Sequence, residues 1–389
     1  MNPKHEASRN EGNVDRISGV RIAYEATPQH GHPIEVAAGI YWIRLPLDSN
    51  LDHVNVYALR DHTGWTLVDA GCNSEKCQAA LDAVFKVGPL AHLPITRIIS
   101  THYHPDHIGL AGKLVKKGAV LYATRVCWLN AKMLQLDDRH LPCHEQIQFV
   151  EQAGLKGMEL EAYRRRAPSN YSQLVSPLPY SYIRIKQDDV LAIGDRNWTI
   201  HVGNGHAAEH ATLWSNDGIA ITGDQILAGT ASNLSVHPSE PSADLVSEWL
   251  ESCERFMHLS SEETFCLPGH NVPFRGLPTR CEQLLASQKM VLARLFETLD
   301  RPKTAVECLD TVYRRTLSTS ERGALIAETV GFLNHLRNQG MVERELIGGN
   351  AFVWKQACRR ARVEQKANIA SAHDSHTNER QLRRSYEFE

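Results

Sequence analysis

The chain has 389 residues, of which 42% are hydrophobic and 22% are charged, and its formal net charge is −3. This length predicts more than one folding unit, and the hydrophobic fraction predicts a sizeable core. The slight negative charge excludes the overall basic field that is typical of proteins that bind DNA or RNA.

The cysteines and the apolar runs indicate where in the cell the protein is expected. Nine cysteines are scattered along the chain without a CxxC pair, which argues against a disulfide framework. The first residues are polar and lack the apolar segment of a signal peptide. No apolar run approaches the roughly 18 residues of a membrane span. We therefore expect a cytoplasmic protein.

The first half of the chain alternates between strand and helix patterns. We expect residues 1–17 to form a polar N-terminal segment, followed by a main domain over residues 18–300. Strands are expected over 40–45, 54–59, 65–68, 95–99 and 120–122, and helices over 74–87 and 108–117. Such alternation predicts an α/β fold.

Residues 124–180 interrupt the alternation and are polar with helical propensity. We interpret them as a helical insertion, here named the lid insertion. Strands are expected again over 182–185, 190–193, 198–202, 211–214, 219–222 and 264–267, and helices over 242–259 and 278–299.

The pattern changes again after residue 300. Helices are expected over 304–313 and 320–339, and two short strands over 342–346 and 351–354. Helix, helix and hairpin form a winged-helix outline over residues 301–355. Residues 356–389 are polar with little periodicity and are expected to be a tail.

The most informative segment follows the predicted strand 95–99. His102, His104, Asp106 and His107 lie within six residues. Buried polar groups without partners cost several kcal/mol, so a core does not gather them without reason. A bound metal ion takes up their lone pairs. The alternative is a histidine-rich loop that faces solvent.

Three more residues of metal-ligand type follow predicted strands, each beside glycine. These are His206, Asp224 and His270. Strand ends at one edge of a sheet converge in space even when they are far apart in the sequence. Together with the first cluster they provide five histidines and two aspartates, which is enough for two metal ions.

This arrangement over about residues 35–290 resembles the metallo-β-lactamase superfamily of hydrolases. The resemblance implies an αββα sandwich that carries the lid insertion and a small C-terminal winged-helix domain. It implies that His102, His104 and His206 bind one divalent ion and that Asp106, His107 and His270 bind a second. Asp224 would bridge both ions, and Asp69 would support the site from behind the ligands.

The complete ligand set resembles the glyoxalase II and lactonase branch. Classical β-lactamases replace the residue at Asp224 with Cys or Ser, and oxygen-reducing di-iron relatives use Glu where this chain has His104. The resemblance thus implies hydrolysis of an ester, a thioester (of acyl-CoA or glutathione type) or a lactone. A hydroxide shared by the ions would attack, with Asp106 and Asp224 as catalytic groups. Zn²⁺ fits these donors, and Fe and Mn share them.

The lid insertion suggests how a substrate is bound. We expect it to fold over the metals, where Tyr163, Arg164, Arg165 and Arg166 would clamp a small anionic or acyl-carrier-linked substrate. The alternative is a helix face in solvent. His53 precedes a strand and is expected near the mouth of the site.

A second hypothesis is a metal-dependent endoribonuclease or phosphodiesterase that holds nucleic acid with the winged helix. The acidic balance of the chain makes nucleic acid the less favoured partner, but five arginines keep the hypothesis open: Arg314, Arg315, Arg322, Arg337 and Arg344. The same segment is alternatively a packing or dimerisation module, which leaves a homodimer open. A third hypothesis is a metal-stabilised binding scaffold, which the full ligand set disfavours.

Overall fold

The computed structural model describes residues 19–29, 31–48, 52–86, 88–314, 317 and 319–358, without the side chains of 319–321 and 324. The predicted N-terminal segment and nearly all of the predicted tail therefore lie outside the described residues, as does Arg315. Within these ranges, no helix combines the length and the apolar character that crossing a bilayer requires.

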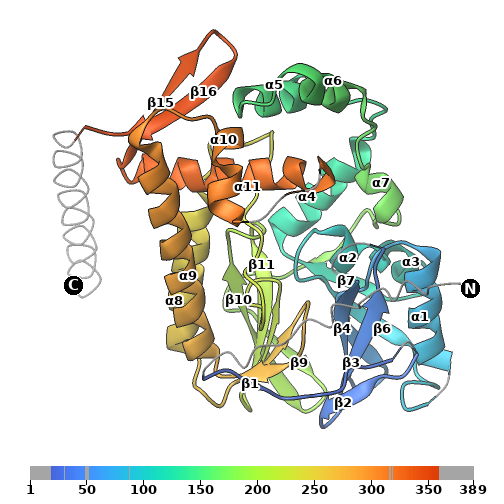
Figure 1. Ribbon diagram of the computed structural model, residues 1–389. Coiled ribbons are helices and arrows are strands. Elements are labelled where there is room, and N and C mark those ends of the chain that lie inside the picture. Colours follow the sequence, from blue (N-terminus) through green and yellow to red (C-terminus); the bar gives the residue numbers. More distant parts are fainter. Residues whose placement is uncertain are drawn as a thin grey trace, which may run out of the picture.

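Two seven-stranded sheets form the centre of the molecule (Figure 1). In spatial order, the first sheet consists of β2 (Ile34–Ala37), β3 (Ile40–Pro46), β4 (His53–Arg60), β5 (Trp65–Val68), β6 (Ile95–Ile99), β7 (Val120–Ala123) and β8 (Ile183–Arg184). The second consists of β1 (Arg21–Ile22), β14 (Phe274–Arg275), β13 (Phe265–Pro268), β12 (Ile219–Gly223), β11 (His210–Ser215), β10 (Arg196–Gly203) and β9 (Val190–Ile193).

The sheets pack face to face, with helices on both outer faces. Trp42 and Tyr57 of the first sheet share a buried cluster with Ile200 and Leu267 of the second. Outside the first sheet lie α1 (Glu75–Lys86), α3 (Ala111–Lys116) and α4 (Arg125–Leu136), and outside the second lie α8 (Leu245–Leu259) and α9 (Leu277–Glu297). This order of layers confirms the expected αββα sandwich.

The sequence explains why α8 lies on the second sheet. Val246, Trp249, Cys253 and Phe256 recur at helical spacing and are all buried. They form one apolar stripe that packs into the outer cluster. The side chain of Asp244 accepts a hydrogen bond from the backbone N–H of Ser247 and caps the first turn.

One predicted helix, over 108–117, is replaced by two short helices, α2 (Pro105–Ile108) and α3. Pro105 occupies the first turn of α2, where its missing N–H costs nothing. The N–H of Leu110 then donates to the carbonyl of Gly71 (3.0 Å). This bond ties the histidine segment to the end of β5.

The lid insertion divides between two parts of the molecule. It contains α4, α5 (His144–Gln152), α6 (Gly157–Arg165) and α7 (Tyr171–Leu174). Residues of α4 and α7 pack into the outer cluster of the first sheet. Residues of α5 and α6, such as Phe149 and Leu160, instead join the cluster that contains α8 and α9.

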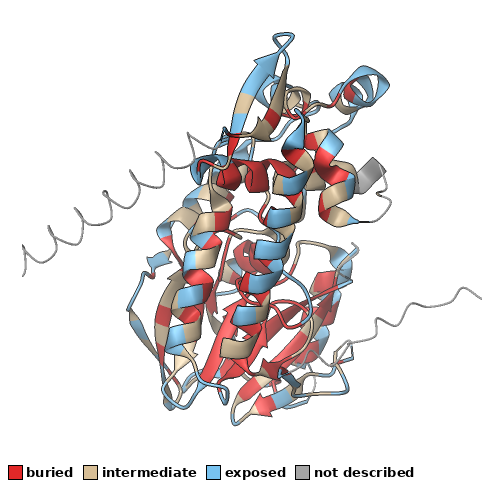
Figure 2. Ribbon diagram, turned by 60° about the vertical axis from the view of Figure 1, so that its left-hand side comes forward, coloured by how far each residue is buried: buried red, intermediate tan, exposed pale blue. Residues whose placement is uncertain are grey.

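The C-terminal module comprises α10 (Ala305–Tyr313), α11 (Thr319–Asn338), β15 (Val342–Ile347) and β16 (Ala351–Gln356). These elements appear in the predicted order, while their assignment as a winged helix stays a prediction. Leu309, Leu333 and Trp354 share one buried cluster with Trp249 and Leu284. The hairpin tip projects into solvent (Figure 2). The module therefore packs against the sandwich through a common core.

Candidate metal centre

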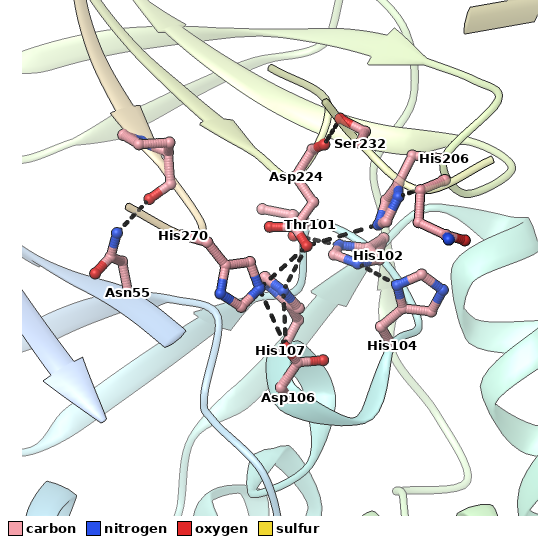
Figure 3. A network of polar contacts seen from close by, with 12 residues as sticks. Asn55, Thr101, His102, His104, Asp106, His107, His206, Asp224, Ser232 and His270 are labelled. Atoms are coloured by element: carbon pink, nitrogen blue, oxygen red, sulfur yellow. Dashed lines mark hydrogen bonds and ion pairs between the residues drawn. The ribbon is translucent and has the colours of Figure 1, made fainter. Parts of the chain in front are cut away.

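The predicted ligand residues converge at one edge of the sandwich, between the two sheets (Figure 3). The first four follow β6 of the first sheet. The other three follow β10, β12 and β13 of the second sheet. Strand ends from both sheets thus supply the same cluster, as the sequence predicts.

Three histidines form one possible metal site, here named the histidine triad: His102, His104 and His206. Their potential ligand atoms all lie within 4.8 Å of one another. The Nδ1 atom of His206 donates to the carbonyl of Asn233 (3.0 Å), and Nδ1 of His102 lies 2.9 Å from the hydroxyl of Thr101. Both rings therefore direct Nε2 towards the centre of the triad.

A second set, here named the mixed triad, contains Asp106, His107 and His270, again with ligand atoms within 4.8 Å. The Nδ1 atom of His107 donates to Asp69 (2.8 Å), and Nδ1 of His270 donates to the backbone carbonyl of His53 (2.8 Å). The Nε2 atoms of both rings are again the ones left to face the site.

Asp224 lies between the two triads. Its Oδ2 atom is 3.6 Å from Nε2 of His206, 3.3 Å from Nε2 of His107 and 3.2 Å from Nε2 of His270. A carboxylate at this position can contact ions in both triads, which fits the predicted bridging role.

The donor atoms fit a pair of divalent cations. The Nε2 atoms of His107, His206 and His270 and the Oδ1 atom of Asp224 are buried and make no hydrogen bond. Buried polar atoms in proteins almost always have a partner. Imidazole and carboxylate donors suit Zn²⁺, and also iron and manganese. The unsatisfied atoms therefore indicate the cations that would complete the site.

The two triads differ in the pKa values of their histidines. Burial lowers the pKa of His104 to about 3, and burial also lowers the pKa of His102. Burial acts in the same direction on His270, but the carboxylates of Asp224 and Asp106 outweigh it and raise its pKa to about 10. The same carboxylates raise the pKa of His107 despite its burial. Without metal, the mixed triad therefore retains protons.

Asp69 lies behind the two triads, and its support of bound ions stays a prediction. Its carboxylate accepts hydrogen bonds from the backbone N–H of Thr101 (2.8 Å), from the Thr101 hydroxyl and from His107. The residue is 2% exposed and has a φ of 63°, in the left-handed region. Asp69 thus orients a ring of the mixed triad and fixes the backbone that leads into the histidine triad.

The lid residues predicted to clamp a substrate lie elsewhere in the described structure. Tyr163 packs against the cluster beneath α8 and α9. Arg164 pairs with Glu151 (3.8 Å) and Glu161 (3.4 Å). Arg165 and Arg166 are exposed at the end of α6. Since α6 packs with α5 rather than with the ligand loops, the structure does not bring these residues into the cluster, and the clamp stays a prediction.

His53 lies beside the mixed triad, with its ring 5.9 Å from the ring of His270. The residue is 7% exposed, and its Nε2 accepts a hydrogen bond from the N–H of Asn271 (3.1 Å). Its hydrogen bond to the mixed triad is made by the backbone carbonyl, which accepts from Nδ1 of His270. Substrate binding by His53 stays a prediction.

Several supporting residues escape the sequence patterns. Asn55 donates to the carbonyls of Pro268 (2.9 Å) and Asn271 (3.1 Å), which flank His270. His210 stacks on His102 with ring centroids 4.6 Å apart, and its Nε2 accepts from the N–H of Asp224 (3.2 Å). Asn55, which lies between Val54 and Val56 in a largely apolar strand, is the one sequence feature that could have indicated such a role.

Comparisons with known proteins agree with this architecture. The family profile described as "Metallo-beta-lactamase superfamily" matches residues 49–270. The chain is 22% identical over 314 residues to the "Probable metallo-hydrolase YqjP" of Bacillus subtilis (strain 168), which covers 80% of this chain and 96% of the relative.

Two solved structures are similar over most of the chain. A beta-lactamase domain protein from Burkholderia ambifaria has a TM-score of 0.79 at 30% identity and covers 87% of this chain and 98% of its own. The metallo-beta-lactamase family protein TTHA1429 from Thermus thermophilus has a TM-score of 0.69 at 23% identity and covers 83% and 100%. Both similarities extend beyond residue 270, because 87% and 83% of the 389 residues are each more than 270 residues.

Proposed function

This chain belongs to the metallo-beta-lactamase superfamily, and from that premise we propose that it is a dinuclear metallohydrolase that cleaves an ester, a thioester or a lactone. The observation that carries the proposal is the pair of triads joined at Asp224, with buried donor atoms that have no hydrogen-bond partner. Seven side chains from both sheets would hold the two ions.

The position of each residue in the site indicates its proposed role. When bound, two divalent ions supply a polarising charge for a carbonyl oxygen and lower the pKa of water towards 7. His102, His107, His206 and His270 would present neutral Nε2 atoms, because their Nδ1 atoms are occupied by the partners described above, whereas His104 turns Nδ1 towards Nε2 of His102 (3.0 Å). The Asp106 side chain is 20% exposed and that of Asp224 is 9% exposed, so Asp106 is the better placed to exchange protons with solvent.

The substrate class is supported by the identity of the ligands. Asp224 stands where classical β-lactamases carry Cys or Ser, and His104 stands where oxygen-reducing relatives carry Glu. We therefore favour esters, thioesters and lactones over β-lactams and over redox chemistry. An anionic or acyl-carrier-linked substrate remains part of this proposal, and so does Zn²⁺ as the metal.

The proposal is tested by metal content and by activity on separate panels. We expect about two Zn²⁺, Fe or Mn ions per chain by elemental analysis. We also expect turnover of at least one p-nitrophenyl ester, acyl-CoA, glutathione thioester or lactone. Cleavage of a labelled RNA panel in place of these substrates would favour the nuclease hypothesis. Purified protein that takes up no divalent metal would contradict both.

A ligand variant provides the matched control. We expect His104→Ala to lower kcat/KM at least roughly 100-fold, because it removes charge stabilisation worth several kcal/mol. His92→Ala alters an exposed histidine outside both triads and is expected to keep full activity. Equal activity of the two variants would show that the triads do not carry the reaction.

A further inference from the structure

The orientation of one ligand depends on a segment between β12 and α8, here named the 225–236 segment. Nδ1 of His206 donates to the backbone carbonyl of Asn233 within this segment (3.0 Å). The Ser232 hydroxyl donates to the carbonyl of Asp224. The segment therefore contacts two of the seven ligands, and its position determines where Nε2 of His206 lies.

The C-terminal module holds this segment directly beside Asn233. A carboxylate oxygen of Glu328, on α11, accepts a hydrogen bond from the backbone N–H of Leu234 (3.1 Å). The other carboxylate oxygen accepts from the hydroxyl of Tyr313 on α10 (2.6 Å). Glu328 is thus fixed by its own module while it binds the residue next to Asn233.

Packing brings the same two elements together. Leu234 and Val236 are each 1% exposed and belong to the cluster that contains Ile326 and Leu333 of α11. At Gly331 the helix approaches the segment so closely that a Cβ atom would lie 2.9 Å from the carbonyl oxygen of Leu234. Such a contact requires the segment to shift, because the opposing atom belongs to the backbone.

We propose that the C-terminal module is part of the metal centre, with Glu328 as a positioning residue that sets His206 through the backbone of Leu234 and Asn233. This inference rests on the proposed function, because it takes His206 as a ligand of the histidine triad. Outer partners of metal ligands typically change metal affinity roughly 10- to 100-fold. If the module only packed on the sandwich, changing Glu328 would lower thermal stability. The ratio between the metal affinities of the histidine triad and the mixed triad would then stay as in the wild type.

The first experiment compares Glu328→Ala with Glu328→Gln in the full chain. Alanine removes the acceptor for Leu234, whereas glutamine retains an oxygen that accepts the same bond. We expect Glu328→Ala to weaken Co²⁺ binding at the histidine triad roughly 10-fold and to leave the mixed triad close to wild type. Glu328→Gln should restore most of this affinity.

The absorption spectra of the Co²⁺ forms identify which triad is affected. His104→Ala and His270→Ala provide reference spectra for loss of the histidine triad and of the mixed triad. Glu328→Ala should resemble His104→Ala at limiting Co²⁺. A spectrum that resembles His270→Ala, or no rescue by Glu328→Gln, would overturn the proposal.

A second pair of variants tests the same contact if Glu328→Ala does not fold. Gly331→Ala adds a methyl group against Leu234, while Gly323→Ala adds one on the same helix at a point where no atom of the described residues outside this helix lies within 4 Å. Alanine favours a helix more than glycine does, so both changes favour α11 itself. We expect only Gly331→Ala to weaken Co²⁺ binding at the histidine triad.

The outcomes also separate this inference from the proposed function. Wild-type protein that binds no Co²⁺ would remove the proposed function itself. Two ions bound with wild-type affinities in both Glu328→Ala and Gly331→Ala would overturn only the role of the C-terminal module.

Discussion

Four imidazole rings of the metal centre are each fixed by a partner on Nδ1. The partners are the Thr101 hydroxyl, the Asp69 carboxylate and the backbone carbonyls of Asn233 and His53. A hydrogen bond at one ring nitrogen determines which nitrogen keeps its lone pair. The ring nitrogen that each histidine presents to the candidate metal centre therefore depends on residues outside the two triads.

Asp69→Asn tests this dependence at a single ring. The amide oxygen can still accept from Thr101, but the amide nitrogen would then face Nδ1 of His107 and donate to it. The proton of the ring would move to Nε2, which could no longer bind a metal. We expect the affinity of the mixed triad to fall roughly 10- to 100-fold, measured by competition with a chromophoric chelator.

The control is Asp217→Asn, which changes an exposed aspartate that pairs with Arg196 on the second sheet. It should bind both ions as the wild type does. If Asp69→Asn also bound both ions normally, the tautomer of His107 would not be set by Asp69.

The raised pKa values in the mixed triad predict how metal binding depends on pH. His270 has a pKa of about 10 without metal, so at pH 7 it carries a proton that an ion must displace. The protonation of His270 alone should therefore lower the metal affinity of the mixed triad about tenfold for each unit by which the pH falls below this pKa. The histidine triad should release no proton near pH 7, because the pKa values of His102 and His104 are lowered.

Proton release is measured with an indicator dye in weakly buffered solution during Zn²⁺ titration. His270→Ala should release at least one proton fewer than the wild type. Equal proton release at both triads would contradict the assignment of charge within the cluster.

At the scale of elements, β4 connects the two sheets behind the site. Asn55 is 1% exposed, donates to two carbonyls beside His270 and accepts from the indole N–H of Trp42 (2.8 Å). Asn55→Ala removes this partner from the indole N–H of Trp42 and from the carbonyl of Asn271, whereas the carbonyl of Pro268 keeps the Tyr57 hydroxyl (2.8 Å). We expect the free energy of unfolding to fall by about 2–4 kcal/mol in urea titrations, because each orphaned group costs about 1–3 kcal/mol.

Thr66 on the neighbouring strand β5 provides the contrast. Its side chain is fully buried and its hydroxyl makes no hydrogen bond. Thr66→Val removes this hydroxyl at nearly constant shape, and we expect a change between zero and about 1 kcal/mol of added stability. A loss as large as that of Asn55→Ala would contradict the account of both strands.

The sequence predicted those elements whose pattern repeats locally. The strand ends that carry His206, Asp224 and His270 could be recognised because each ligand follows an apolar run beside glycine. The break between α2 and α3 could not, because it depends on a bond from Leu110 to Gly71, 39 residues earlier. The arginines of α6 were equally hard to place, since a polar helix pattern does not say which neighbour the helix packs against.

Backbone partners leave no signal in a sequence. The carbonyl of Asn233 orients His206 and the carbonyl of His53 orients His270, yet any residue type supplies a carbonyl. That the residues of the two triads lie together was therefore predictable from one sequence, whereas the contacts that orient their rings required the fold.

At the scale of the whole molecule, the candidate metal centre joins the two sheets. Strand β6 of the first sheet leads into the histidine segment, and the second sheet supplies His206, Asp224 and His270. Each triad draws ligands from both sheets. Bound ions would therefore cross-link the sandwich at the edge that carries the ligand loops.

Chelation with EDTA tests this cross-link. A metal ion whose free concentration is 100 times its Kd stabilises the folded state by about 2.7 kcal/mol. Removal of the metal should therefore lower the free energy of unfolding by at least that amount. Without ions, the buried Nε2 atom of His206 has no hydrogen-bond partner, and those of His107 and His270 face only the carboxylates of Asp106 and Asp224. We expect amide hydrogen exchange to accelerate together in residues 100–108 and 203–210, one segment from each sheet. Faster exchange in one segment alone would show that the sheets are held at this edge by their own packing, since ions shared between the sheets protect both or neither.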